Sequence, residues 1–197
     1  VAVANMPLYK TDKINALPVI EFTKADATSL SFDGTSIANS EYTIFIVEQR
    51  TSSEIYNYFM GGSDTANHSN LHFGYRNSSM IYLAMANNGL SFGVPSYTTP
   101  VPRIHSFTFD FSKRLYYING DLEIEGVVGT DYDTIGGAYE ERAVSSWTDA
   151  ALGRYLTNYF QGDIGEVIMF NKYLKTEDRK SIERYLGKKW KIEVADD

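Results

Sequence analysis

The sequence predicts an all-β protein, a jelly-roll β-sandwich of two antiparallel sheets with one C-terminal α-helix. Aromatic residues make up 14% of the 197 residues, and aromatic side chains suit the pleated, half-buried surface of a sheet. Roughly ten short apolar or alternating segments are separated by turn residues, which is typical of sandwiches and jelly rolls. Helical spacing of apolar residues appears near the end of the chain, which predicts one closing helix.

The strands expected in the first half of the chain are short and bounded by polar residues and glycines. Residues 42–48 are apolar on both faces, which predicts a central strand. The other strands expected here cover residues 19–22, 30–34, 56–60 and 71–75.

Two Asn-Gly pairs, Asn88–Gly89 and Asn119–Gly120, each stand between two apolar runs. Both residues of such a pair readily adopt the positive φ of a type I′ turn, so each pair predicts a β-hairpin. Between the two hairpins, Phe107, Phe109 and Phe111 alternate with polar residues. This alternation predicts a strand with one buried and one solvated face.

Near the end of the chain, the run 161–171 predicts a tight turn, a strand that is apolar on both faces and a second turn, and a helix follows. Thr176 is the expected N-cap, with acidic residues in the first turn where the helix dipole favours them. The apolar stripe expected to face the sheet follows at spacings of three and four and consists of Ile182, Tyr185, Leu186 and Trp190.

Three motifs in this order resemble the laminin-G-like domains of the concanavalin A-like superfamily. They are residues 30–34 followed by 42–47, then 116–120, and finally 160–168 with the helix ending at Trp190. The resemblance implies a single β-sandwich domain over residues 1–197. It says little about the ligand, because lectins, glycosidases, lyases and adhesion modules share this fold.

Composition excludes several classes of function. The net charge is −7, and Lys and Arg do not cluster except at the end of the helix, which argues against nucleic acid. No apolar run approaches 18 residues, so no membrane insertion is expected. Cysteine is absent, which removes disulfides and thiolate sites. The chain has neither a signal peptide nor an initiator Met and is expected to be a piece of a longer protein.

The segment 129–150 is the first candidate for a sugar site, because long loops in compact domains are usually functional or mobile. It carries Tyr132, Tyr139 and Trp147 beside Arg142. Aromatic rings stack on sugars while charged groups bond their hydroxyls. The same composition suits a subunit interface of a homo-oligomer or a packed loop that covers the sandwich. Tyr97, in a proline-rich loop, is a further candidate for sugar binding.

The resemblance also implies a Ca²⁺ site in a loop at the rim of the sandwich, where oxygen ligands gather. Asp64 is the best single candidate, and Asp131 and Asp133 form a second candidate site. The alternative for each is a carboxylate that caps its own turn.

Catalysis is not supported by the sequence. Glycosidases of this fold carry paired carboxylates that alternate on one strand. Glu123 and Glu125 come nearest, but they follow a hairpin turn, where a solvated face is expected. The three histidines show no metal-binding spacing.

The sequence therefore predicts a non-catalytic carbohydrate-binding or adhesion module. Its expected partner is a glycan or cell-surface receptor, and its expected setting is an extracellular bacterial protein or the tail or capsid surface of a virus. The alternatives are a glycan hydrolase or lyase of the same fold and a structural decoration or oligomerisation domain.

Overall fold

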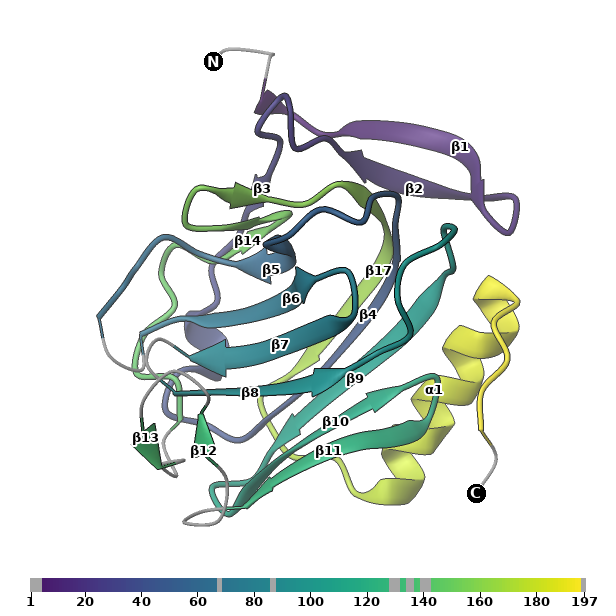
Figure 1. Ribbon diagram of the computed structural model, residues 1–197. Coiled ribbons are helices and arrows are strands. Elements are labelled where there is room, and N and C mark those ends of the chain that lie inside the picture. Colours follow the sequence, from purple (N-terminus) through teal and green to yellow (C-terminus); the bar gives the residue numbers. More distant parts are fainter. Residues whose placement is uncertain are drawn as a thin grey trace.

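The computed structural model describes residues 5–66, 69–85, 88–127, 132–133, 137–138 and 143–195. Two antiparallel sheets face each other, and a C-terminal helix lies outside them (Figure 1). The all-β jelly roll with one helix is thus confirmed. In the described part, no helix is long and apolar enough to cross a lipid bilayer.

The larger sheet has seven strands. From edge to edge these are β1 (Leu8–Ile14), β2 (Leu17–Phe22), β17 (Gly162–Phe170), β4 (Tyr42–Arg50), β9 (Arg103–Phe109), β10 (Lys113–Ile118) and β11 (Asp121–Val127). β4 lies at the centre and is buried along almost its whole length, as its two apolar faces predict.

The second sheet has six strands. In order these are β3 (Leu30–Ser31), β14 (Ala151–Leu152), β5 (Asn57–Gly61), β6 (Leu71–Asn77), β7 (Met80–Met85) and β8 (Asn88–Gly93). The remaining short elements are the pair β12 (Tyr132–Asp133) and β13 (Gly137–Ala138), the pair β15 (Arg154–Tyr155) and β16 (Asn158–Tyr159), and the 3₁₀ turn η2 (Thr35–Ile37).

The main core fills the space between the two sheets. Alternate residues of each strand point inward, because side chains alternate across a strand. Phe73 of β6 stacks on Phe107 of β9 with the ring centroids 4.1 Å apart, and Phe59 of β5 packs against both β9 and Phe160. These contacts join the two sheets across the sandwich.

A second core joins α1 (Thr176–Trp190) to the outer face of the seven-stranded sheet. Leu186 and Trp190 pack against Phe45, Val47 and Ile104. Figure 1 shows α1 on the side of β9, β10 and β11 that faces away from β6 and β7. The helix does not cover the outer face of the six-stranded sheet, where the hairpin of β15 and β16 packs against β5 instead.

Four local expectations need correction. Asn88 and Gly89 belong to β8 rather than to the turn, because Met85 pairs with Asn88. The polar face of β9 is buried rather than solvated, since α1 covers it. Tyr185 is 51% exposed and does not join the apolar stripe of the helix. Thr176 is the first helical residue, and Lys175 is the N-cap without a side-chain hydrogen bond.

Candidate carbohydrate-binding site

The outer face of the six-stranded sheet is rich in aromatic side chains. On β6 the side chains of Leu71 and Phe73 belong to the inter-sheet core, so His72 between them points outward. Tyr58 of β5 and Tyr82 of β7 lie beside His72, at centroid distances of 5.8 and 5.3 Å. The outer face therefore carries a group of adjacent rings, which are buried, with only 2 to 6% of each residue exposed.

Two glycines on this face make room for the rings. A Cβ at Gly74 would lie 2.4 Å from the Cα of Tyr58, and a Cβ at Gly89 would lie 2.3 Å from the hydroxyl oxygen of Tyr82. Any larger residue at Gly89 would displace the Tyr82 ring. This requirement explains why the glycine of the predicted turn is instead part of β8.

The hairpin formed by β15 and β16 adds a fourth ring. Tyr155 stacks on His72 with the ring centroids 3.7 Å apart and the planes at 6° to each other. It also packs edge-to-face with Tyr58, where the ring centroids are 5.1 Å apart. The hairpin is anchored where Gly153 adopts a φ of 77°, a conformation that glycine accepts readily. Its amide donates to the carbonyl of Phe59 at 2.8 Å. We call Tyr58, His72, Tyr82 and Tyr155 the aromatic face.

His72 is neutral at physiological pH. Its side chain is 2% exposed, and burial, together with the nearby charge of Arg114, lowers its pKa to about 3. Its Nδ1 is buried and has no hydrogen-bond partner in the described part of the chain. Burial also raises the pKa of Tyr58 and of Tyr155, so both hydroxyls remain protonated donors.

A group of polar side chains adjoins the aromatic face at the ends of β5 and β6. Asp149 accepts the amide and the hydroxyl of Ser63 through Oδ2. Asn70 donates through Nδ2 to the carbonyl of Asp64 at 2.9 Å. Burial opposes the ionisation of Asp149, but the bonds from Ser63 and the charge of Arg154 outweigh it and lower its pKa. We call Ser63, Asn70, Asp149 and Arg154 the rim cluster.

Three members of the rim cluster keep a buried polar atom without a partner among the described residues. These atoms are Oδ1 of Asn70, Oδ1 of Asp149 and Nε of Arg154. Gly62 lies between two of them, because a Cβ there would be 2.7 Å from Oδ1 of Asp149 and 3.3 Å from Nδ2 of Asn70. Buried polar groups are nearly always bonded. Two free acceptors and one free donor beside stacked rings therefore match the hydroxyls of a sugar.

Trp147 is in the core, which corrects its assignment as a stacking residue. Its side chain is 0% exposed, and its Nε1 donates to the carbonyl of Gly61 at 3.1 Å. The indole packs edge-on against Phe32 at 5.3 Å and lies directly over Gly34. No ring face remains for a sugar. With Val144 and Ala150 also buried, residues 143–150 form a packed segment that closes the sandwich.

Tyr97 lies at the opposite end of the six-stranded sheet. Its amide donates to the carbonyl of Ser78, just after β6, and its ring lies 5.1 Å from the guanidinium of Arg50. The rim cluster adjoins the start of β6 at Asn70, eight residues earlier, which corresponds to about 26 Å along a strand. Tyr97 therefore does not belong to the same site.

The other predicted sugar ligands remain untested by the structure. Tyr139 and Arg142 lie outside the described residues. Tyr132 begins β12, whose backbone alone is described.

The described part of the loop around Asp64 shows a turn cap, and the calcium site predicted there stays a prediction. Oδ1 of Asp64 accepts the amide of Ala66 at 2.9 Å, so this carboxylate caps its own turn. Within the described ranges, no three acidic, histidine or cysteine side chains are close enough to share a metal ion. Asp131 lies outside those ranges, and Asp133 is described by its backbone alone, so the second predicted site stays a prediction.

Three carboxylates of the seven-stranded sheet, Glu48, Glu123 and Glu125, lie in two different environments. Glu123 and Glu125 are exposed, and Glu125 forms an ion pair with Lys113 at 3.1 Å. Glu48 is 0% exposed between the sheets. Its Oε1 accepts the hydroxyl of Tyr75 at 2.6 Å and contacts Nε2 of His105 at 2.7 Å. A polysaccharide could not reach Glu48 without opening the core.

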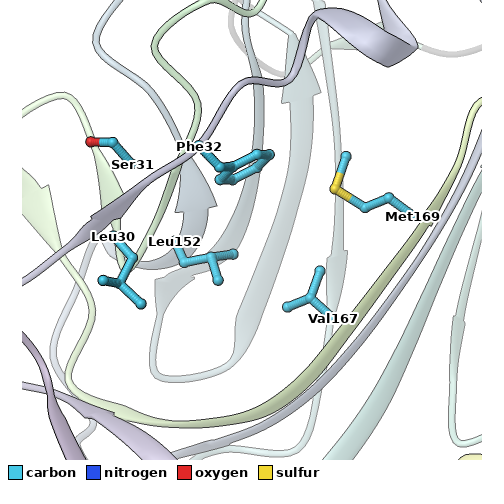
Figure 2. A pocket seen from close by; sticks show the side chains of 6 residues that line it. All are labelled: Leu30, Ser31, Phe32, Leu152, Val167 and Met169. Atoms are coloured by element: carbon cyan, nitrogen blue, oxygen red, sulfur yellow. The ribbon is translucent and has the colours of Figure 1, made fainter.

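A cavity of about 410 Å³ lies beside β3, β14 and β17 and is mainly apolar. Figure 2 shows Phe32, Leu152, Val167 and Met169 turned toward a common space, while the hydroxyl of Ser31 points away from it. A sugar site needs several converging polar groups. This cavity lacks them, because its lining is almost entirely apolar.

No protein-family model and no curated protein sequence matches the chain significantly. Solved structures do resemble it. Domain 4 of the GH43 extracellular arabinanase AbnA from Geobacillus stearothermophilus, in complex with arabinotriose, matches with a TM-score of 0.63 and 14% identity over 90% of this chain and 81% of that chain.

Two further structures share the fold. The CBM40 domain of the Ruminococcus gnavus IT-sialidase, bound to α2,3-sialyllactose, matches with a TM-score of 0.60 and 15% identity over 89% of this chain and 98% of that domain. Tailspike protein 2 of an Escherichia coli O157:H7 bacteriophage matches with a TM-score of 0.64 and 12% identity over 91% of this chain and 26% of the tailspike. At 12 to 15% identity these likenesses show a shared fold.

Proposed function

We propose that this chain is a non-catalytic carbohydrate-binding module that holds its glycan on the outer face of the six-stranded sheet. One observation carries the proposal: four adjacent aromatic rings lie beside unpaired polar atoms on the sheet face that α1 leaves uncovered. Sugar binding uses ring stacking and hydrogen bonds to hydroxyls, and the groups for both lie side by side here.

Each part of the site has a distinct role in binding. Tyr155 is partly exposed and offers a ring to the apolar face of a sugar, while His72 beneath it fixes the orientation of that ring. The unpaired atoms of Asn70, Asp149 and Arg154 exchange hydrogen bonds with the sugar hydroxyls. Because the scaffold already orders most of these groups, little conformational entropy is lost on binding.

The absence of catalysis belongs to the same proposal. A retaining glycosidase needs two carboxyl groups about 5 Å apart, and an inverting one needs them about 6.5–9.5 Å apart. At the proposed site the described residues supply Asp149, one of whose oxygens is bonded to Ser63, and Asp64, which caps its own turn. This arrangement supports binding rather than bond cleavage.

The setting that we propose is extracellular, on a bacterial surface or a virion, where the module attaches a larger protein to a glycan receptor. The support is the fold shared with domains of an extracellular arabinanase, a sialidase and a phage tailspike.

A glycan array followed by titration of the selected glycan tests the proposal. Tyr155→Ala should weaken binding about tenfold or more, because a lost stacking contact and its buried area cost roughly 1–2 kcal/mol. Tyr185→Ala is the matched control, since Tyr185 is an exposed tyrosine on α1, behind the other sheet. Tyr155→Phe keeps the ring and should keep most of the affinity.

Two results would contradict the proposal. One is the failure of every glycan on the array to bind the intact protein. The other is a Tyr155→Ala variant that stays folded and binds as well as the wild type, which would move the site elsewhere. A parallel array with a chelator tests whether glycan binding needs a calcium ion, such as the one predicted at Asp131 and Asp133.

A further inference from the structure

Arg76 is a cation on the aromatic face for which the described residues supply no ion pair. It follows Tyr75 at the end of β6, and its guanidinium lies 5.3 Å from the ring centroid of Tyr82. The side chain is partly exposed. Its charge reaches the hydroxyl of Tyr58, where it opposes the larger effect of burial on the pKa of that group.

Several other surface cations of this acidic chain form ion pairs. Lys13, Lys113 and Lys189 each bind a glutamate at 2.8 to 3.1 Å. Among the described residues no carboxylate lies within 4.0 Å of Arg76. The chain carries a net charge of −7, so an unpaired arginine on its aromatic face is a local exception to its overall charge.

Arg154 adds a second positive charge near the same face. It too has no carboxylate within ion-pair distance in the described part of the chain, although its charge lowers the pKa of Asp149. Asp149 itself is held by Ser63. Among the described residues, this part of the molecule carries two guanidinium groups, Arg76 and Arg154, and the two carboxylates of Asp64 and Asp149.

We propose that the ligand of this site is an acidic glycan, and that Arg76 binds the carboxylate or sulfate of one of its sugars. The inference rests on the proposed function of the aromatic face. A guanidinium presents a planar fork of donors that matches such a group with two parallel hydrogen bonds. Contact with the ring of Tyr82 restrains Arg76 before the ligand arrives, so less side-chain freedom is lost on binding.

Matched pairs of glycans test this inference. The pairs are α2,3-sialyllactose with lactose, uronic-acid oligosaccharides with their carboxyl-reduced forms, and sulfated oligosaccharides with their desulfated forms. We expect at least one acidic member to bind about tenfold or more tightly than its neutral partner, and we expect this preference to fall as the NaCl concentration rises. The pair that responds identifies the anionic group.

Variants separate the charge from the rest of the site. Arg76→Gln should abolish the preference for the acidic member while leaving the affinity for the neutral member within about twofold, and Arg76→Lys should restore part of it. Arg184→Gln, on α1, is the control and should change neither affinity.

The outcomes distinguish this inference from the proposed function. Glycan binding with equal affinity within every pair would overturn the acidic ligand and leave the carbohydrate site standing. A preference that survives Arg76→Gln in a folded protein would overturn the role of Arg76. Failure of all glycans to bind would overturn both.

Discussion

Single residues show most clearly where local reasoning succeeds and where it fails. Trp147 is of a residue type that commonly stacks on sugars, yet it is a core residue. Its ring lies over Gly34, and its Nε1 donates to the carbonyl of Gly61. His72 reads as a polar residue of an alternating strand, yet burial and Tyr155 make it the base of the aromatic face. Residue type does not reveal these environments, because the contacting groups come from distant parts of the chain.

Asp163 on β17 makes a prediction at this scale. Its side chain is 1% exposed, and Oδ1 has no partner in the described structure. Burial raises its pKa from 3.8 to about 6, while Lys13 opposes the shift. The folded state therefore holds this proton more tightly than the unfolded state. The resulting stabilisation is complete below about pH 3.8 and is lost as the pH rises through about 6.

Asp163→Asn should consequently raise the free energy of unfolding at pH 8 by at most about 3 kcal/mol, and with it the melting temperature. This gain in stability should vanish near pH 4. Thermal unfolding between pH 4 and pH 8 measures the effect. Asp26→Asn removes an exposed carboxylate and controls for net charge. A gain that does not depend on pH, or a loss at pH 8, would contradict the assignment.

At the scale of elements, short sequence motifs predict turns correctly, whereas the burial of a strand face depends on which other element packs against it. Asn119 and Gly120 have φ of 52° and 89°, and Ile118 pairs with Asp121, so this hairpin is the type I′ turn that the sequence predicts. The solvated face expected for β9 is wrong because α1 covers it, with Ser106 donating to Glu183 at 2.6 Å. An amphipathic helix reveals its apolar face in the sequence but does not reveal which sheet it will cover.

The docking of α1 depends on a glycine in β17. A Cβ at Gly165 would lie 2.4 Å from Cη2 of Trp190, whose Nε1 donates to Glu166 at 2.7 Å. Gly165→Ala should lower the free energy of unfolding by about 1–3 kcal/mol through overpacking. Gly93→Ala is the matched control, because the nearest atom to its Cβ would be 3.9 Å away.

Urea denaturation of both variants measures this difference. The affinity for a glycan should stay unchanged in Gly165→Ala, because α1 lies on the seven-stranded sheet. Equal stability of the two glycine variants would show that Trp190 does not need the space above Gly165.

At the scale of the whole molecule, the sequence predicts the sandwich and the closing helix but not the site. The fold could be predicted from the alternating strands and from the closing helix that ends at Trp190, because both are patterns within short stretches of the sequence. The aromatic face combines Tyr58, His72 and Tyr82 from neighbouring strands with Tyr155 from a hairpin more than seventy residues later. The strand order of the six-stranded sheet brings the first three rings together and the β15–β16 hairpin adds Tyr155, and no spacing in the sequence encodes this arrangement.

The central claim is the location of the glycan site, and an NMR titration of the isotope-labelled chain with the glycan selected by the array tests it most directly. We expect the residues whose amide chemical shifts change with glycan concentration to lie on β5 to β8 and in residues 153–159. Shifts centred instead on α1, or on the apolar cavity beside β3 and β17, would contradict it.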